Sequence, residues 1–308
     1  MSDIPFNKTF TPRYGECVAV APGIRRVVAE NPGPFTFYGT GTYILGQGHV
    51  AVIDPGPELP DHIDALDRAL AGETVEAILI THTHRDHVPA ARPFQALRGG
   101  TRAVPIYGFG PHGGGDPDQP VEEGADFSFA PDIRIGDGDV VEGTGWSVEA
   151  VHTPGHTSNH LCFSYREAAA AEGALFSGDH VMGWSTSVIS PPDGNMSDYL
   201  NALEKLRHRA EDRYYPTHGA PIEGARDYVA HFIAHRRRRE AEILDAIAAG
   251  AETVPAMVDA IYDDIPPGLK PAAGRSVLAH LEMLVAEARV ESDTGDAVAR
   301  ARYRLSIG

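Results

Sequence analysis

The sequence predicts an α/β fold in two units: a sheet-based unit with helical cover over residues 1–224 and a winged-helix-like unit over residues 225–308. Three observations lead to this prediction. Short apolar runs alternate with turns and helices through the first unit, as in a protein built on β-sheets with helical cover. Several of these runs end abruptly in His or Asp. After about residue 224 the pattern changes to longer amphipathic helices followed by a hairpin.

The composition is that of an ordinary soluble globular protein, with 42% hydrophobic and 22% charged residues over 308 positions. Its 26 Lys and Arg against 43 Asp and Glu leave a net charge of −17, which argues against a general nucleic-acid or anionic-membrane binder. No apolar run approaches membrane-spanning length, and the first residues lack the pattern of a signal peptide. We read Cys17 and Cys162 as core thiols, which fits a cytoplasmic protein.

The elements expected in the first unit follow from hydrophobic periodicity and turn residues. The strands are expected at 18–20, 24–28, 40–45, 50–54, 75–80, 103–107, 147–152, 161–165 and 174–180. The helices are expected at 59–71, 90–98 and 197–210. Residues 108–120 are rich in Gly and Pro, which indicates either a substrate lid or a plain loop insertion.

The strand at 75–80 runs directly into a cluster of metal-binding residue types. His82 and His84 lie two residues apart, so in an extended chain they share a face and can point at one ion. Pro89 suits the first turn of a following helix, which would turn Asp86 and His87 towards a second ion. Four candidate ligands within six residues predict a metal site, because burying so many polar groups without a partner is costly.

The same residue types recur at the ends of later strands. His152 closes the strand at 147–152, Asp179 follows an apolar run, and His218 ends the series near residue 219. If loops at one edge of a rigid scaffold converge, these side chains meet the first cluster.

The segment from Thr81 to His87 resembles the His-x-His-x-Asp-His signature of the metallo-β-lactamase superfamily, and the resemblance extends over about residues 15–220. It implies that the sheet-based unit is a four-layered αβ/βα sandwich and that it holds two metal ions. Carried over residue by residue, it implies that the first metal is held by His82, His84 and His152, the second by Asp86, His87 and His218, with Asp179 bridging both. Imidazole and carboxylate ligands favour Zn²⁺, with iron and manganese as alternatives.

The resemblance also implies a chemistry. Two metal ions would share a water as hydroxide, which attacks the substrate, while Asp86 and Asp179 orient it. An Asp at position 179 is typical of the thioesterase, lactonase and ribonuclease branches, whereas a Cys there would suggest an antibiotic-hydrolysing enzyme.

Three further residues are candidates for supporting the site. The resemblance implies that Asp54 supports the His cluster, and a strand-ending Asp that caps a turn explains it equally well. His156 and His180 are candidates for supporting residues or proton donors, although we favour packed turn residues for both.

The C-terminal unit narrows the family further. Helices are expected at 225–249, 254–262 and 272–288, with a hairpin pairing 289–291 and 299–305. This arrangement resembles the β-lactamase-like proteins with a winged-helix tail, which include a mitochondrial endoribonuclease and many bacterial hydrolases. The tail differs from the helical glutathione-binding region of glyoxalase II, a related enzyme.

The tail carries one notable charge run, Arg236–Arg239. It indicates either a contact to phosphate or an acidic substrate, or, as we favour, a solvated helix face. The helix at 272–288 has no basic stripe, so we expect no DNA binding and instead a structural or dimerising role for the tail.

Three functions fit the sequence. The acidic net charge favours a dinuclear-zinc hydrolase of a small-molecule thioester, lactone or other ester. The alternative is a metal-dependent endoribonuclease, which the tail and the arginine run allow. A third reading is a non-catalytic zinc-binding interaction protein, against which the complete ligand set argues.

Overall fold

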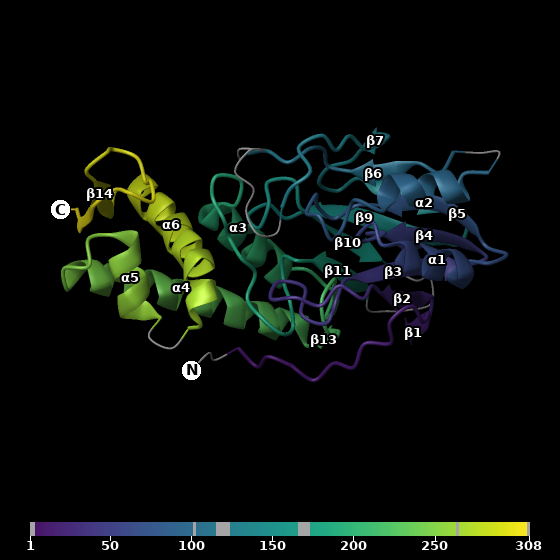
Figure 1. The fold of residues 1–308 in the computed structure, drawn as a ribbon, viewed down its shortest axis with the longest axis horizontal. Helices are drawn as coiled ribbons and strands as arrows, with labels where there is room; N and C mark the ends of the chain where they lie inside the picture. Colours follow the sequence, from purple (N-terminus) through teal and green to yellow (C-terminus); the bar gives the residue numbers. More distant parts are fainter. Residues whose placement is uncertain (1–3, 101–102, 115–123, 166–172, 263–264, 307–308) are drawn as a thin grey trace.

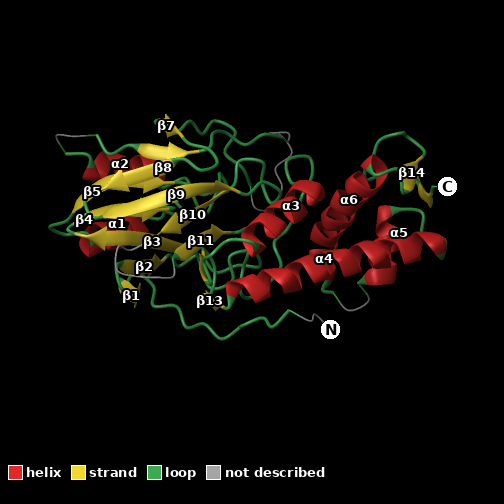
Figure 2. Cartoon of the chain, turned by 180° about the vertical axis from the view of Figure 1, so that it is seen from behind, coloured by secondary structure: helices red, strands yellow, loops and turns green. Residues whose placement is uncertain are grey.

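The computed structural model describes residues 4–100, 103–114, 124–165, 173–262 and 265–306. Two stacked β-sheets with helices outside them form the larger part, and a helical unit lies at one end (Figures 1 and 2). The first sheet takes its strands in chain order: β1 (Val18–Ala21), β2 (Ile24–Val28), β3 (Gly41–Gln47), β4 (His49–Ile53), β5 (Thr74–Leu79), β6 (Ile106–Gly108) and β7 (Ile133–Arg134). The second sheet, in the spatial order β13-β12-β11-β10-β9-β8, contains β8 (Val140–Gly143), β9 (Trp146–His152), β10 (Leu161–Tyr165), β11 (Ala174–Gly178), β12 (Arg213–Pro216) and β13 (Ile222–Glu223).

The inner strands are largely apolar because both of their faces are covered. In β3, Tyr43 and Leu45 point into the core between the sheets, whereas Ile44 points to the helices outside. In β10, Phe163 faces the same inter-sheet core and Cys162 faces the opposite helical layer. Successive side chains along each strand point to opposite faces of the sheet, so they pack alternately into the layer between the sheets and into the helical layer outside.

Helices cover both outer faces of the sheets. Helices α1 (Pro60–Ala69) and α2 (Ala91–Arg98) contribute to the core outside the first sheet. Helix α3 (Met196–Arg207) and the start of α4 (Ala225–Ala248) pack outside the second sheet (Figure 2). The predicted four-layered αβ/βα sandwich is confirmed.

The C-terminal unit has its own hydrophobic core. It contains α5 (Val254–Ile261), a short 3-10 turn η1 (Pro267–Leu269), α6 (Lys270–Ala286) and the antiparallel pair β14 (Val290–Ser292) and β15 (Tyr303–Leu305). The expected three helices and hairpin are therefore present.

Helix α4 belongs to both cores. Val229 and Phe232 pack against α3 and the second sheet, whereas Ile243 and Ile247 pack in the C-terminal core. Figure 2 shows this helix running from beneath the second sheet to the far end of the molecule. The boundary after residue 224 stays a prediction, but α4 ties the two units together across it.

Several smaller expectations can be compared with the structure. Cys162 is buried as expected, but Cys17 is exposed, since it lies at the outer edge beside β1. The solvated-face reading of the arginine run fails for Arg236, which is only 3% exposed. Part of the 108–120 loop, from residue 115 on, lies outside the described residues. No described helix is long and apolar enough to cross a membrane.

Candidate metal centre

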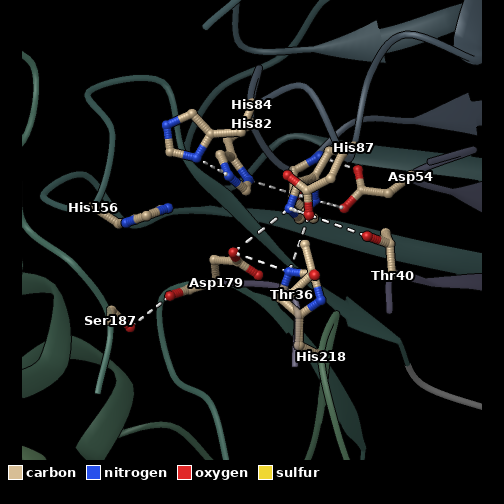
Figure 3. Close-up of polar contacts among 12 residues, drawn as sticks. Thr36, Thr40, Asp54, His82, His84, His87, His156, Asp179, Ser187 and His218 are labelled. Atoms are coloured by element: carbon tan, nitrogen blue, oxygen red, sulfur yellow. Dashed lines mark hydrogen bonds and ion pairs between the residues drawn. The ribbon is translucent and has the colours of Figure 1, made fainter. Parts of the chain in front are cut away.

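Loops from both sheets bring the His and Asp side chains together at one edge of the sandwich (Figure 3). Strand β5 leads into the segment 82–87, β9 and β10 flank the turn at residue 156, and β11 and β12 are followed by Asp179 and His218. Since strand ends are held by the ladders on either side, the loops start from fixed positions.

Three imidazoles form the first group. His82, His84 and His156 are all buried, and each offers a ring nitrogen within 4.8 Å of the others. Nε2 of His82 lies 3.0 Å from Nδ1 of His84. In Figure 3 the ring of His156 points towards these two residues from the opposite side.

A second group lies beside the first. It contains Asp86, His87 and His218, and Asp86 Oδ2 lies 3.3 Å from His87 Nε2 and 3.1 Å from His218 Nε2. Asp179 stands between the groups, because its carboxylate is also within 4.8 Å of ring nitrogens of His82 and His87. Six of the seven predicted ligands are thus brought together.

The centre contains polar atoms that the surrounding protein does not satisfy. His87 Nε2, His156 Nε2 and Asp179 Oδ1 are buried and have no hydrogen-bond partner among the described residues. Such atoms are rare in folded proteins because each costs about 1–3 kcal/mol. Nitrogen and carboxylate atoms converging without protein partners fit metal ions, which accept both kinds of ligand.

The electrostatics favour the same interpretation. Burial alone would raise the pKa of Asp86 and Asp179, but the imidazoles of His87 and His218 outweigh it and hold both pKa values well below the usual range. Burial, together with neighbouring imidazoles, lowers the pKa of His82 well below its ordinary value. The same carboxylates outweigh burial at His87 and His218 and raise the pKa of both rings above the ordinary value. A metal ion bound here would displace the protons from these two rings, because a histidine binds metal in its neutral form.

Asp54 supports the centre from beneath. Its carboxylate accepts hydrogen bonds from the backbone N–H and the hydroxyl of Thr81, at 2.8 and 2.6 Å, and lies 2.9 Å from His87 Nδ1. Its backbone has a φ of +46°, a left-handed conformation that is uncommon for a residue with a side chain. This geometry turns Nε2 of His87 towards the centre and is the role that the resemblance implied for Asp54.

The structure does not bring His152 into this cluster. Its ring stacks on Phe109, with centroids 4.3 Å apart, and its Nε2 lies 3.0 Å from the carbonyl oxygen of Ser158. His156, which we expected only as a supporting or packed turn residue, lies with His82 and His84 instead. The other candidates follow strand ends directly, whereas His156 follows a turn.

The turn that carries His156 depends on Gly155. A Cβ at this glycine would lie 2.3 Å from the Cα of Tyr199 in α3, and its φ is +130°. Only glycine allows so close an approach, so the turn can fold back and direct His156 to the centre. The Pro-Gly-His order after β9 was the available signal.

His180 is placed differently from the other candidates. It is buried against the ring of Tyr199, 4.6 Å between centroids, and belongs to none of the ligand groups found among the described residues. Its carbonyl oxygen accepts the Tyr199 hydroxyl, so the structure gives it the packed role that we favoured.

The sequence reasoning missed several groups that orient the ligands. The Thr40 hydroxyl donates to Asp86 at 3.1 Å, and the Ser187 hydroxyl donates to the backbone oxygen of Asp179 at 2.6 Å. Gly39 and Val188 offer carbonyl oxygens to His218 and His156. No local pattern marks them, because each contacts a ligand far away in the sequence.

Known proteins share both parts of this chain. Residues 36–218 match the family model of the metallo-beta-lactamase superfamily, and residues 253–299 match the beta-lactamase associated winged helix domain. A beta-lactamase-like protein 2 homolog of Caenorhabditis elegans is 33% identical, with 87% of this chain and 86% of that protein covered. An atrochrysone carboxyl ACP thioesterase of Aspergillus fumigatus is 31% identical over 83% of this chain and 78% of that enzyme.

The fold has solved counterparts. A beta-lactamase domain protein from Burkholderia ambifaria superposes with a TM-score of 0.75 at 22% identity, covering 96% of this chain and 95% of that one. The family match over the sandwich, the match over the tail and the converging His and Asp cluster lead to one conclusion. The chain belongs to the metallo-β-lactamase superfamily and is a hydrolase that carries the winged helix domain associated with that fold.

Proposed function

We propose that this protein is a dinuclear-zinc hydrolase of a small-molecule thioester, lactone or other ester. The observation that carries the proposal is the pair of adjacent ligand groups with Asp179 between them. A non-catalytic zinc protein would not need two such groups around a shared carboxylate.

The described side chains divide between two ions. His82, His84 and His156 would hold one, and Asp86, His87 and His218 would hold the other, with Asp179 in reach of both. Zinc is favoured because it accepts imidazole and carboxylate ligands, with iron and manganese as alternatives.

When bound, the two ions supply a lowered pKa for water and polarisation of the substrate carbonyl oxygen. The protein supplies orientation. Asp86 and Asp179 remain ionised, so both can accept a hydrogen bond from the attacking water and hold it towards the acyl carbon. The Thr40 hydroxyl, by donating to Asp86, leaves the other carboxylate oxygen free for this role.

Two observations support an acyl substrate. Several relatives, at 30–32% identity, are named as atrochrysone carboxyl ACP thioesterases, which act on a thioester. The net charge of −17 disfavours a polyanion such as RNA as the general substrate.

The test is a set of parallel assays on the zinc-loaded protein, using acyl thioesters, lactones and short single-stranded RNA. We expect ester or thioester hydrolysis that disappears with a chelator and returns when zinc is added. His84→Ala and Asp179→Ala should lose both metal and turnover, whereas His152→Ala should keep both. Chelator-sensitive cleavage of RNA alone would overturn the proposal in favour of the ribonuclease.

A further inference from the structure

A cavity of about 330 Å³ extends from the metal centre towards the C-terminal unit. His156 and Asp179 line it at one end, and Tyr262 and Ala272 line it at the other. A substrate whose acyl carbon sits at the centre would therefore extend between the sandwich and the winged helix domain.

Much of the cavity lining is apolar. Its larger apolar and aromatic side chains are Phe35, Met182, Trp184, Tyr262, Ile265 and Leu269. Trp184 is held by stacking on Phe37, with ring centroids 4.6 Å apart. This apolar wall suits a chain of methylene groups or a ring, because burial of apolar surface away from water is favourable.

Two arginines of α4 also line the cavity. Arg236 is 3% exposed, donates from Nη2 to the carbonyl oxygen of Ser187 and lies over the ring of Tyr199. Its Nε is buried without a hydrogen-bond partner, and no carboxylate among the described residues pairs with it. A buried cation without an opposite charge is costly, so an anion that enters the cavity would be stabilised there.

Arg239 lies one turn further along the helix. It pairs with Glu242 at 2.5 Å and covers the ring of Tyr262 at 4.1 Å, and its Nε is also buried without a hydrogen-bond partner in the described part of the chain. By contrast, Arg237 is 55% exposed in its side chain, pairs with Glu240 and does not line the cavity. The arginine run therefore has two members facing the cavity and one that serves as a matched comparison.

We propose that this cavity binds the arm of an ester or thioester substrate that combines an apolar segment with a carboxylate or phosphate group, and that Arg236 and Arg239 recognise this oxyanion. The inference takes the hydrolytic reaction from the proposed function, on which it rests, and specifies the class of substrate. A guanidinium suits this role because it offers planar, charge-assisted hydrogen bonds to an oxyanion, which are stronger than neutral ones.

Two substrate pairs test the inference and distinguish the two sources of the anion. Adipoyl and hexanoyl thioesters of N-acetylcysteamine differ by a terminal carboxylate on the acyl side. Hexanoyl phosphopantetheine and hexanoyl pantetheine differ by a phosphate on the thiol side. We expect kcat/KM to favour the charged member of one pair by at least about tenfold.

Variants assign the preference to the arginines. Arg239→Gln should reduce the ratio of kcat/KM for the charged substrate over the uncharged one to near one. Arg237→Gln also breaks an i,i+3 ion pair with a glutamate, but it should leave this ratio unchanged. Equal rates within both pairs, or equal effects of the two variants, would overturn the inference.

The apolar wall has its own test, which does not depend on the arginines. Ala272→Phe would fill the cavity near Leu269. Hydrolysis of the hexanoyl thioester should fall about tenfold or more, while the shorter acetyl thioester should change by about twofold or less. Equal losses for both chain lengths would contradict an acyl or thiol arm in this space.

A binding measurement separates this inference from the proposed function. The protein has two tryptophans, so Trp146→Phe leaves Trp184 as the sole reporter in the cavity. In metal-free protein, adipate or phosphopantetheine should alter Trp184 fluorescence at concentrations where hexanoate and pantetheine do not. If uncharged thioesters are hydrolysed but no charged probe binds preferentially, this inference fails and the proposed function stands. If charged probes bind but no ester is hydrolysed, the proposed function fails instead.

Discussion

Nδ1 of His156 lies 2.6 Å from the carbonyl oxygen of Val188. A carbonyl oxygen can only accept, so Nδ1 must carry a proton, and Nε2 is the ring atom left to face the centre. His218 has the same arrangement, with Nδ1 3.1 Å from the carbonyl oxygen of Gly39. Backbone groups outside the centre thus set the tautomer of two ligands before any metal arrives, which is the usual role of hydrogen bonds behind metal-binding histidines.

The first prediction compares the two histidines of the β9–β10 turn. His156→Ala should remove one ion per chain and lower kcat by at least about 100-fold, since a ligand is lost. His152→Ala should keep the full metal content and most of the activity, because its ring only stacks on Phe109 and contacts Ser158. Metal analysis of the purified proteins checks this, and the reverse result would restore His152 as the ligand.

A second prediction concerns the residue behind His87. Asp54→Asn should weaken metal binding by about 10–100-fold, because the amide is a poorer acceptor for His87 Nδ1 and Thr81 together. The measurement is a competition titration with a chelator dye. Asp132→Asn, which loses a carboxylate far from the centre, is the control. If Asp54→Asn bound metal as tightly as the wild type, Asp54 would have only the role of capping the turn.

The third prediction tests whether the sandwich depends on the helix that follows it. A chain ending at residue 224 lacks Val229 and Phe232, which are fully buried in the core beside α3. Loss of these side chains should cost on the order of 5 kcal/mol or more, comparable with the whole stability of a domain. A chain ending at Gly250 keeps both residues. The chain that ends at residue 224 should therefore unfold at a lower temperature than the chain that ends at Gly250. Equal melting temperatures would show that the sandwich does not need α4.

The fourth prediction is a pH dependence that arises in the C-terminal unit. Burial, together with Arg236 and Arg239, lowers the pKa of His280 well below its ordinary value of 6.5. Below pH 6.5 the unfolded chain takes up a proton that the folded protein does not, so stability falls as pH decreases, by about 1.4 kcal/mol per pH unit at most.

His280→Phe removes this contribution. Denaturant unfolding of metal-free wild type and variant should diverge progressively below pH 6.5 and run in parallel above it. Other buried histidines affect both proteins equally, so the difference between the two curves isolates residue 280. A constant difference from pH 5 to pH 8 would mean that His280 titrates normally in the folded state.

Local patterns were sufficient for the sheets and for most of the centre. The apolar runs that become β5 and β10 are continuous because both faces are buried, and that is visible in the chain itself. The segment from His82 to His87 places four ligands within six residues, so it needs no distant partner to be recognised.

Tertiary packing decided the rest. Whether His152 or His156 faces the His and Asp cluster depends on how the turn at Gly155 presses against Tyr199 in α3, a contact between segments about 40 residues apart. The burial of Arg236 depends on the carbonyl oxygen of Ser187 and the ring of Tyr199, whereas its sequence context is that of a solvated charge run. The fold, the family and six of the clustered His and Asp residues could be predicted from the chain alone, because those signals are local. The place of His156 in the cluster and the charged cavity come from long-range contacts, which local periodicity does not encode.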